Sequence, residues 1–110
     1  MRSDRERLQD ILEAIERIER HANQGRELFE KDELVQIWMV HHFQIIGEAA
    51  SRISENLVGS HPEVPWPQMV AMRNVLVHDY FGVDVDEVWN TVANDLPPLK
   101  AAITAILESV

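Results

Sequence analysis

The spacing of hydrophobic residues near the start of the chain predicts an amphipathic helix. Apolar side chains recur every three or four positions and form one stripe: Leu8, Ile11, Leu12, Ile15 and Ile18. Ser3, with Glu6 three residues later, has the spacing of a capping box. We therefore expect a helix from Ser3 to about residue 22, with a charged, solvated outer face, ended by the Asn23-Gln24-Gly25 break.

The next stretch predicts the longest helix, from about Asp32 to Leu57. Its apolar line repeats with the helical period and is widened by Phe43 and Ile46: Leu34, Ile37, Trp38, His41, Ile45, Ala49, Ile53 and Leu57. Gly47 lies inside this helix, where glycine is disfavoured by about 1 kcal/mol relative to alanine. A glycine there suits the close approach of a ligand or, as we favour, of another helix.

Prolines and glycines divide the rest of the chain. Residues 59–67 hold three prolines and a glycine and are expected to form a loop, with Pro67 in the first turn of a third helix that ends near His78. Asp84, three residues before Glu87, predicts the cap of a fourth helix. Residues 95–98 should kink or break that helix before a last helical segment.

These elements predict an all-α fold. No segment shows the sustained alternation of a β-strand, and the helices are joined by short loops. We expect one domain over residues 1–110, an up-and-down bundle of four main helices with a short additional helical segment. Trp38, Trp66 and Trp89 are expected to be core or interface anchors.

Composition narrows the range of functions. The chain has no cysteine, which excludes disulfides and thiolate metal sites, and the adjacent His41 and His42 point in different directions on a helix. We therefore expect no metal and no cofactor. The charged N-terminus lacks the apolar stretch of a secretion signal, and no apolar run is long enough for a membrane span, so a cytoplasmic protein is expected.

The net charge of −9 argues against electrostatic binding of nucleic acid over a broad surface. The basic residues are unevenly distributed, however: seven of the ten lie at or before Lys31, and only Arg52, Arg73 and Lys100 follow. An isolated arginine such as Arg73, among apolar neighbours, therefore needs an explanation of its own.

Residues 73–80 bring Arg73, His78 and Tyr80 close together in the sequence. These side chains suit cleavage of a phosphodiester without metal. Histidine can move the protons of the 2′-hydroxyl and the 5′-oxygen, and a guanidinium can stabilise charge on the non-bridging oxygens. Tyrosine can stack on a base or bind a phosphate oxygen. A single histidine cannot serve as base and acid in one turnover, which points to a second subunit or to water. The spacing alone leaves a purely structural role for the three residues open.

The arrangement Arg73-x4-His78-x-Tyr80 resembles the signature of the HEPN superfamily, and specifically of HepT-like toxins. The resemblance extends over almost the whole chain, through IIGEAA at residues 45–50, MRNVLVHDYFGVD at residues 72–84, VW at 88–89 and DLPPLK at 95–100. It implies a HEPN-like four-helix bundle that forms a homodimer, with a composite site at the interface that cleaves RNA without metal.

The resemblance also assigns roles to residues. It implies that Arg73 and His78 are catalytic, and that Tyr80 accepts AMP from a MntA-like nucleotidyltransferase antitoxin that silences the toxin. Asn74 and Glu48 are possible supporting residues. Glu48 could orient Arg73, although we favour a simple ion pair with Arg52 one helical turn away.

Two alternatives remain at this stage. The chain could be a non-catalytic HEPN module that binds a nucleotide or a nucleotidyltransferase partner without cleaving RNA. It could also be a dimeric scaffold in which the motif has a structural role.

Overall fold

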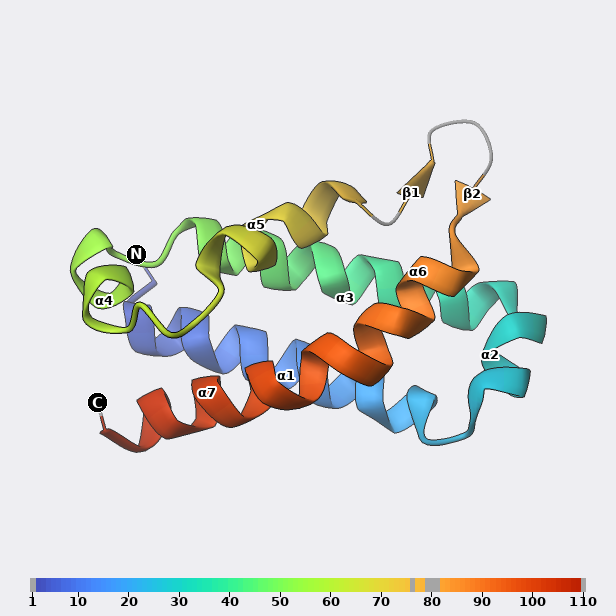
Figure 1. Cartoon of the computed structure of the whole chain (residues 1–110), viewed down its shortest axis with the longest axis horizontal. Helices are drawn as coiled ribbons and strands as arrows, with labels where there is room; N and C mark the ends of the chain where they lie inside the picture. Colours follow the sequence, from blue (N-terminus) through green and yellow to red (C-terminus); the bar gives the residue numbers. More distant parts are fainter. Residues whose placement is uncertain (1, 76, 79–81, 110) are drawn as a thin grey trace.

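The computed structural model describes residues 2–75, 77–78 and 82–109, and for residues 74, 75, 77, 78, 82 and 83 the description is limited to the backbone. Four main helices run side by side along the molecule: α1 (Asp4–Ala22), α3 (Glu33–Ser51), α5 (Trp66–Val75) and α7 (Leu96–Ser109) (Figure 1). Shorter elements join them: α2 (Arg26–Lys31), α4 (Glu55–Ser60), β1 (Val77–His78), β2 (Gly82–Val83), α6 (Val85–Asn90) and the π-helical η1 (Thr91–Asp95). The predicted all-helical bundle is confirmed, apart from the two short strands.

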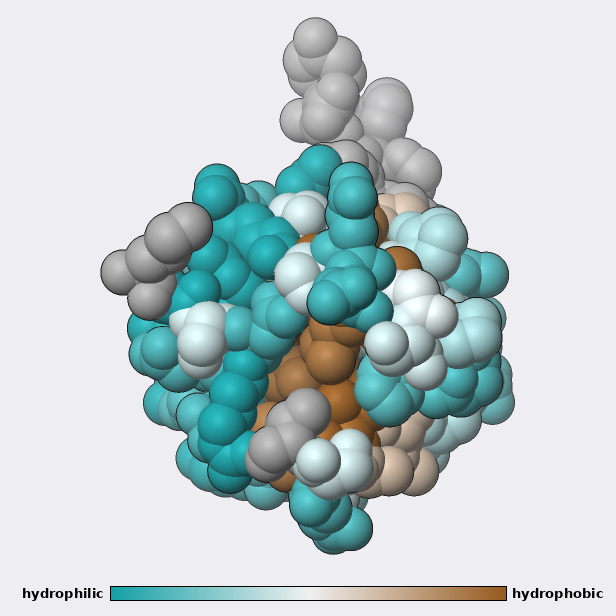
Figure 2. Space-filling model, turned by 90° about the vertical axis from the view of Figure 1, so that its left-hand side faces the viewer, coloured by the Kyte–Doolittle hydropathy of each residue, from teal (hydrophilic) through white to brown (hydrophobic). Residues whose placement is uncertain are grey.

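The core lies where α3 packs against both α1 and α5, and where α1 packs against α7. Its largest fully buried side chains come from all four helices, among them Ile15, Phe43, Met69 and Ile103. Both termini lie at one end of the bundle, and viewed from that end a band of hydrophobic side chains reaches the surface between hydrophilic rims (Figure 2). No helix within the described ranges combines the length and apolar character needed to span a membrane.

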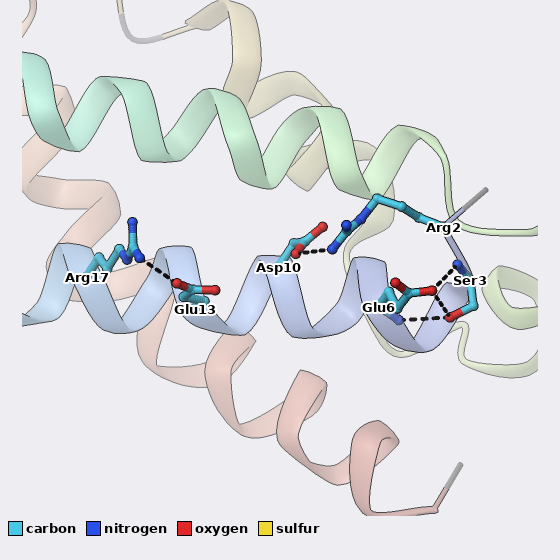
Figure 3. Close-up of polar contacts among 6 residues, drawn as sticks. All are labelled: Arg2, Ser3, Glu6, Asp10, Glu13 and Arg17. Atoms are coloured by element: carbon cyan, nitrogen blue, oxygen red, sulfur yellow. Dashed lines mark hydrogen bonds and ion pairs between the residues drawn. The ribbon is translucent and has the colours of Figure 1, made fainter.

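Local sequence signals account for the start of α1. The Glu6 amide donates to Ser3 Oγ over 3.2 Å, and the Ser3 amide donates to Glu6 Oε1 over 3.1 Å, so the predicted capping box is present (Figure 3). Leu8, Ile11 and Ile18 in the predicted stripe are fully buried. The helix ends at Ala22, immediately before the predicted break.

The single helix predicted from Asp32 to Leu57 is wrong beyond Ser51. Asp32 does cap α3, accepting from the amides of Leu34 and Val35, but α3 ends at Ser51 and α4 begins after Ser54. The Ser54 hydroxyl accepts from the Leu57 amide over 3.2 Å and donates to the Asp4 carboxylate over 2.5 Å. Ser54 thus caps a new helix and ties it to α1, and no proline or glycine marks the change. Before α3, the chain forms α2, which was not predicted.

The predicted buried face of α3 is also partly wrong. Leu34, Ile37 and Trp38 are 78%, 51% and 37% exposed, whereas Met39 and Phe43 are fully buried. The physical reason is the position of α3 between α1 and α5, which selects the face that their side chains can cover. An apolar strip on the N-terminal half of α3 therefore remains uncovered in the single chain.

The third helix ends earlier than predicted. α5 stops at Val75, and β1 pairs antiparallel with β2 so that Val77 lies opposite Val83 and His78 opposite Gly82. His78 is therefore on a strand and not at the end of the helix that carries Arg73. Pro67 lies in the first turn of α5, as predicted.

The last third of the chain is more continuous than its prolines suggest. Asp84 caps α6 by accepting from the Glu87 amide over 3.1 Å, which confirms the predicted cap. The expected interruption near residues 95–98 is a change of hydrogen bonding, because the Leu96 amide donates to the Thr91 carbonyl five residues earlier. Pro97 and Pro98, which have no amide hydrogen to donate, follow directly after this change, at the start of α7.

Candidate functional site

The site is built on a close contact between α3 and α5. A Cβ placed on Gly47 would lie 2.8 Å from both the backbone nitrogen and the Cβ of Arg73, and 3.0 Å from the Val70 carbonyl oxygen. Gly47 is buried, and α5 passes directly over it. The predicted role of this glycine in close helix packing is confirmed. The contact sets the position of the Arg73 backbone relative to the middle of α3.

Glu48, the next residue on α3, binds two arginines with its two carboxylate oxygens. Oε1 accepts from Arg52 Nε over 2.7 Å, and Oε2 accepts from Arg73 Nη1 over 3.2 Å. Glu48 therefore forms the expected ion pair with Arg52, the residue that follows α3, and also contacts Arg73 on α5; that it supports Arg73 in a reaction stays a prediction. Sequence spacing could not show the second contact, because 25 residues separate the partners.

The carboxylate remains ionised and the site remains open to solvent. The hydrogen bond from Arg52 is the main cause that lowers the pKa of Glu48, and the charge of Arg73 contributes. The Arg73 side chain is 39% exposed, so its remaining guanidinium donors can reach an anionic ligand. The ion pairs of Glu48 with Arg52 and Arg73 are exposed and therefore contribute little to the free energy of unfolding.

Of the other motif residues, Asn74 lies on α5 and His78 lies on β1. β1 places the backbone of His78 three residues after the end of α5, and β2 contacts α3. The side chains of His78 and Asn74 lie outside the description, as does the whole of Tyr80, so the predicted convergence of Arg73, His78 and Tyr80 stays a prediction.

The remaining histidines do not form a metal site in the part of the chain that is described, where no group of three or more histidine or acidic side chains is placed to hold an ion. His42 is 2% exposed, and its Nδ1 lies 2.7 Å from the Trp38 carbonyl oxygen. Burial lowers its pKa, which favours the neutral ring. The Trp38 ring lies against His42 and against His21 of α1, with centroids 4.3 and 5.5 Å apart. This cluster packs α1 against α3.

Comparison with known proteins decides the family. Residues 11–106 match the family model described as Ribonuclease HepT-like, a range that includes Gly47, Glu48, Arg73 and the β-pair. The chain belongs to the HepT-like ribonuclease family. It is 44% identical over 100 residues to a protein of Thermococcus cleftensis named probable ribonuclease HepT, and the match covers 90% of this chain and 91% of that protein.

Other relatives are less similar in sequence but also match over most of both chains. A protein of Caldanaerobacter subterraneus subsp. tengcongensis, named as a candidate RNase, is 34% identical over 109 residues, which cover 98% of this chain and 97% of its own. A candidate RNase of Methanocaldococcus jannaschii is 32% identical over 104 residues, which cover 94% and 86% of the two chains. No solved structure gives a significant match. The resemblance read from the motif is therefore confirmed at the level of the family.

Proposed function

We propose that this HepT-like chain is a metal-independent endoribonuclease toxin whose catalytic residues are Arg73 and His78. The observation that carries the proposal is the Arg73 guanidinium. It is held by Glu48 across the close contact at Gly47, is partly exposed, and is followed within a few residues by the strand that contains His78. A cation that can stabilise charge on the phosphate and a histidine that can transfer a proton suit metal-free phosphodiester cleavage.

In the proposed reaction, the 2′-hydroxyl of the nucleotide preceding the break attacks the adjacent phosphorus. The bond from phosphorus to the 5′-oxygen breaks, leaving a 2′,3′-cyclic phosphate on one fragment and a 5′-hydroxyl on the other. Arg73 stabilises the charge that builds on the non-bridging oxygens. His78 transfers one of the two protons: it accepts from the 2′-hydroxyl or donates to the departing 5′-oxygen.

The second proton transfer leads us to propose a homodimer with a composite site, in which the partner supplies its own His78. The uncovered apolar strip of α3 supports this assembly. Leu34, Ile37 and Trp38 expose hydrophobic surface on the half of α3 nearest the β-pair, and a second copy could bury it. Leu34→Glu, at the most exposed of the three positions, should shift the chain toward monomer in sedimentation velocity at micromolar concentration. Exposed Leu28→Glu on α2 is the matched control.

For regulation, we propose a MntA-like nucleotidyltransferase as the antitoxin, with Tyr80 as AMP acceptor. Family membership and the position of Tyr80 two residues after His78 support this assignment. Intact-mass measurement after co-expression with such a partner should show one added AMP per chain, and Tyr80→Phe should remove it. Modification that persists in Tyr80→Phe would place the acceptor elsewhere.

The nuclease proposal is tested with purified protein, chelator and a labelled single-stranded RNA. Wild type should cleave the RNA and leave cyclic phosphate ends, whereas Arg73→Ala and His78→Ala should lose at least about a hundredfold in rate because each removes a group acting on the transition state. Circular dichroism checks that each variant is folded. Undiminished cleavage by His78→Ala would refute the proposal, and binding of RNA or nucleotide without any cleavage by wild type would favour a non-catalytic module.

A further inference from the structure

A groove runs between the N-terminal half of α1 and the C-terminal half of α3, on the side of Glu48 away from α5. Its volume is about 360 Å³, and it is lined by three arginines: Arg2 just before α1, Arg7 on α1, and Arg52, the residue that follows α3. Ile45 and Ala49 of α3 also line it. The groove meets the candidate active site at Glu48, whose second oxygen holds Arg73.

The charge of this groove is opposite to that of the whole molecule. Three arginines line it against two carboxylates, although the chain has a net charge of −9. Each carboxylate is already neutralised by one of these arginines: Arg2 donates to Asp10 over 2.6 Å (Figure 3), and Arg52 donates to Glu48 over 2.7 Å. The groove is thus a local concentration of positive charge on an acidic protein.

Arg7 is the cation that stands out. Among the described residues it forms no ion pair and its side chain donates no hydrogen bond, while its neighbours Arg2 and Arg52 are both paired. Its guanidinium therefore retains its full set of donors for an external anion. Arg52 can exchange its partner easily, because its ion pair with Glu48 is exposed and such pairs are weak.

We propose that this groove binds the ribose-phosphate backbone of single-stranded RNA on one side of the scissile phosphate, with Arg7 and Arg52 as phosphate ligands. The inference rests on the proposed function, because it takes the phosphate at Arg73 as the point of cleavage. Glu48 joins the guanidinium groups of Arg52 and Arg73, so a strand in the groove passes directly to the candidate active site. The exposed His41 at the groove offers a ring on which a base can stack.

The arginine-lined groove explains how a chain with a large negative net charge can bind RNA, which is also negatively charged. Backbone contacts supply most of the affinity in RNA binding, and they require cations only along the path of the strand. The acidic remainder of the surface would repel RNA that approaches elsewhere and so favour entry along the groove. A protein partner on the same groove is the competing explanation, and the experiment separates the two.

The test is a binding titration with a fluorescent single-stranded RNA carrying 2′-O-methyl groups throughout, which lacks the hydroxyl needed for cleavage. Fluorescence anisotropy at several salt concentrations gives the Kd and its salt dependence for wild type, Arg7→Gln, Arg52→Gln and the double variant. Lys31→Gln is the matched control: it removes the same charge from an exposed side chain on α2 that pairs with Glu27 of its own helix.

Arg7→Gln should raise the Kd about three- to tenfold. The plot of the logarithm of the binding constant against the logarithm of salt concentration should become less steep by about 0.7, the value for one phosphate contact on a single strand. The double variant should lose about two contacts, and Lys31→Gln should stay within about twofold of wild type. Equal binding by Arg7→Gln and Lys31→Gln would overturn the inference. So would an unchanged Kd together with a change in sedimentation, which would identify the groove as a protein interface.

The same proteins tested on unmodified RNA separate this inference from the proposed function. If wild type cleaves RNA but Arg7→Gln binds and cleaves like wild type, the nuclease stands and the groove is wrong. If wild type binds the methylated RNA through Arg7 but does not cleave unmodified RNA, the groove stands and the nuclease proposal fails.

Discussion

Replacing Gly47 with alanine is the most direct test of how this site is held together. The added methyl group would lie 2.8 Å from the backbone nitrogen and Cβ of Arg73 and 3.0 Å from the Val70 carbonyl oxygen. Two of these three atoms belong to the backbone of α5, so a side-chain rotation cannot relieve the contact. The helices must instead move apart, which lifts α5 from α3 and displaces Arg73 from Glu48.

The magnitude follows from two opposing effects. Alanine stabilises a helix interior by up to about 1 kcal/mol relative to glycine, and overpacking of this kind costs about 1–3 kcal/mol. Gly59 provides the matched control, because it lies in α4 and a Cβ there would meet nothing within 4 Å. Gly47→Ala should therefore be less stable than Gly59→Ala by about 1–3 kcal/mol.

Urea denaturation followed by circular dichroism gives the free energy of unfolding for wild type and both variants. RNA cleavage is measured under conditions in which all three are folded. Gly47→Ala should lose activity there because Arg73 has moved, whereas Gly59→Ala should cleave like wild type. Equal stability and equal activity of the two variants would show that the α3–α5 contact neither limits packing nor positions Arg73.

Three further predictions concern single side chains. Glu48→Gln should lower the rate of RNA cleavage with little change in stability. Because the pKa of Glu48 is lowered, chiefly by the hydrogen bond from Arg52, the wild-type carboxylate should stay ionised and hold Arg73 until the pH falls below 4.5, the ordinary value for glutamate. Burial lowers the pKa of His42, so the unfolded chain binds a proton at this ring more readily than the folded chain does. Urea denaturation should show a free energy of unfolding that is full above pH 6.5, the ordinary histidine value, and that declines as the pH falls through it, with a smaller decline in His42→Gln. Asp32→Ala should cost about 1 kcal/mol in the same assay, because it removes the N-cap of α3, and an unchanged midpoint would contradict that role.

Much of the architecture is determined locally and could be predicted from the sequence. The capping box of Ser3 and Glu6, the Asp84 cap and the placement of Pro67 each depend on side chains within a few residues of the backbone they satisfy. The role of Gly47 could also be predicted, because a glycine inside a strongly periodic helix lowers stability and is expected where another part of the chain passes close to it.

The predictions that were wrong share one cause, because each depends on contacts between residues far apart in the sequence. Whether Leu34 or Met39 of α3 is buried depends on where α1 and α5 lie, which the period of one helix does not contain. The separate helix α4 begins after Ser54, whose bond to Asp4 spans 50 residues. The end of α5 before His78 coincides with the pairing of β1 and β2.

The same division applies to the candidate site. The family and the motif residues Arg73, His78 and Tyr80 could be predicted from the sequence, because residue types and their spacing are properties of the chain before it folds. The folded chain was needed to show that Glu48 holds Arg73 as well as Arg52, and that Arg7 and Arg52 line one groove. These contacts join residues from different helices, so they exist only once α1, α3 and α5 have packed and the distances between their side chains are set.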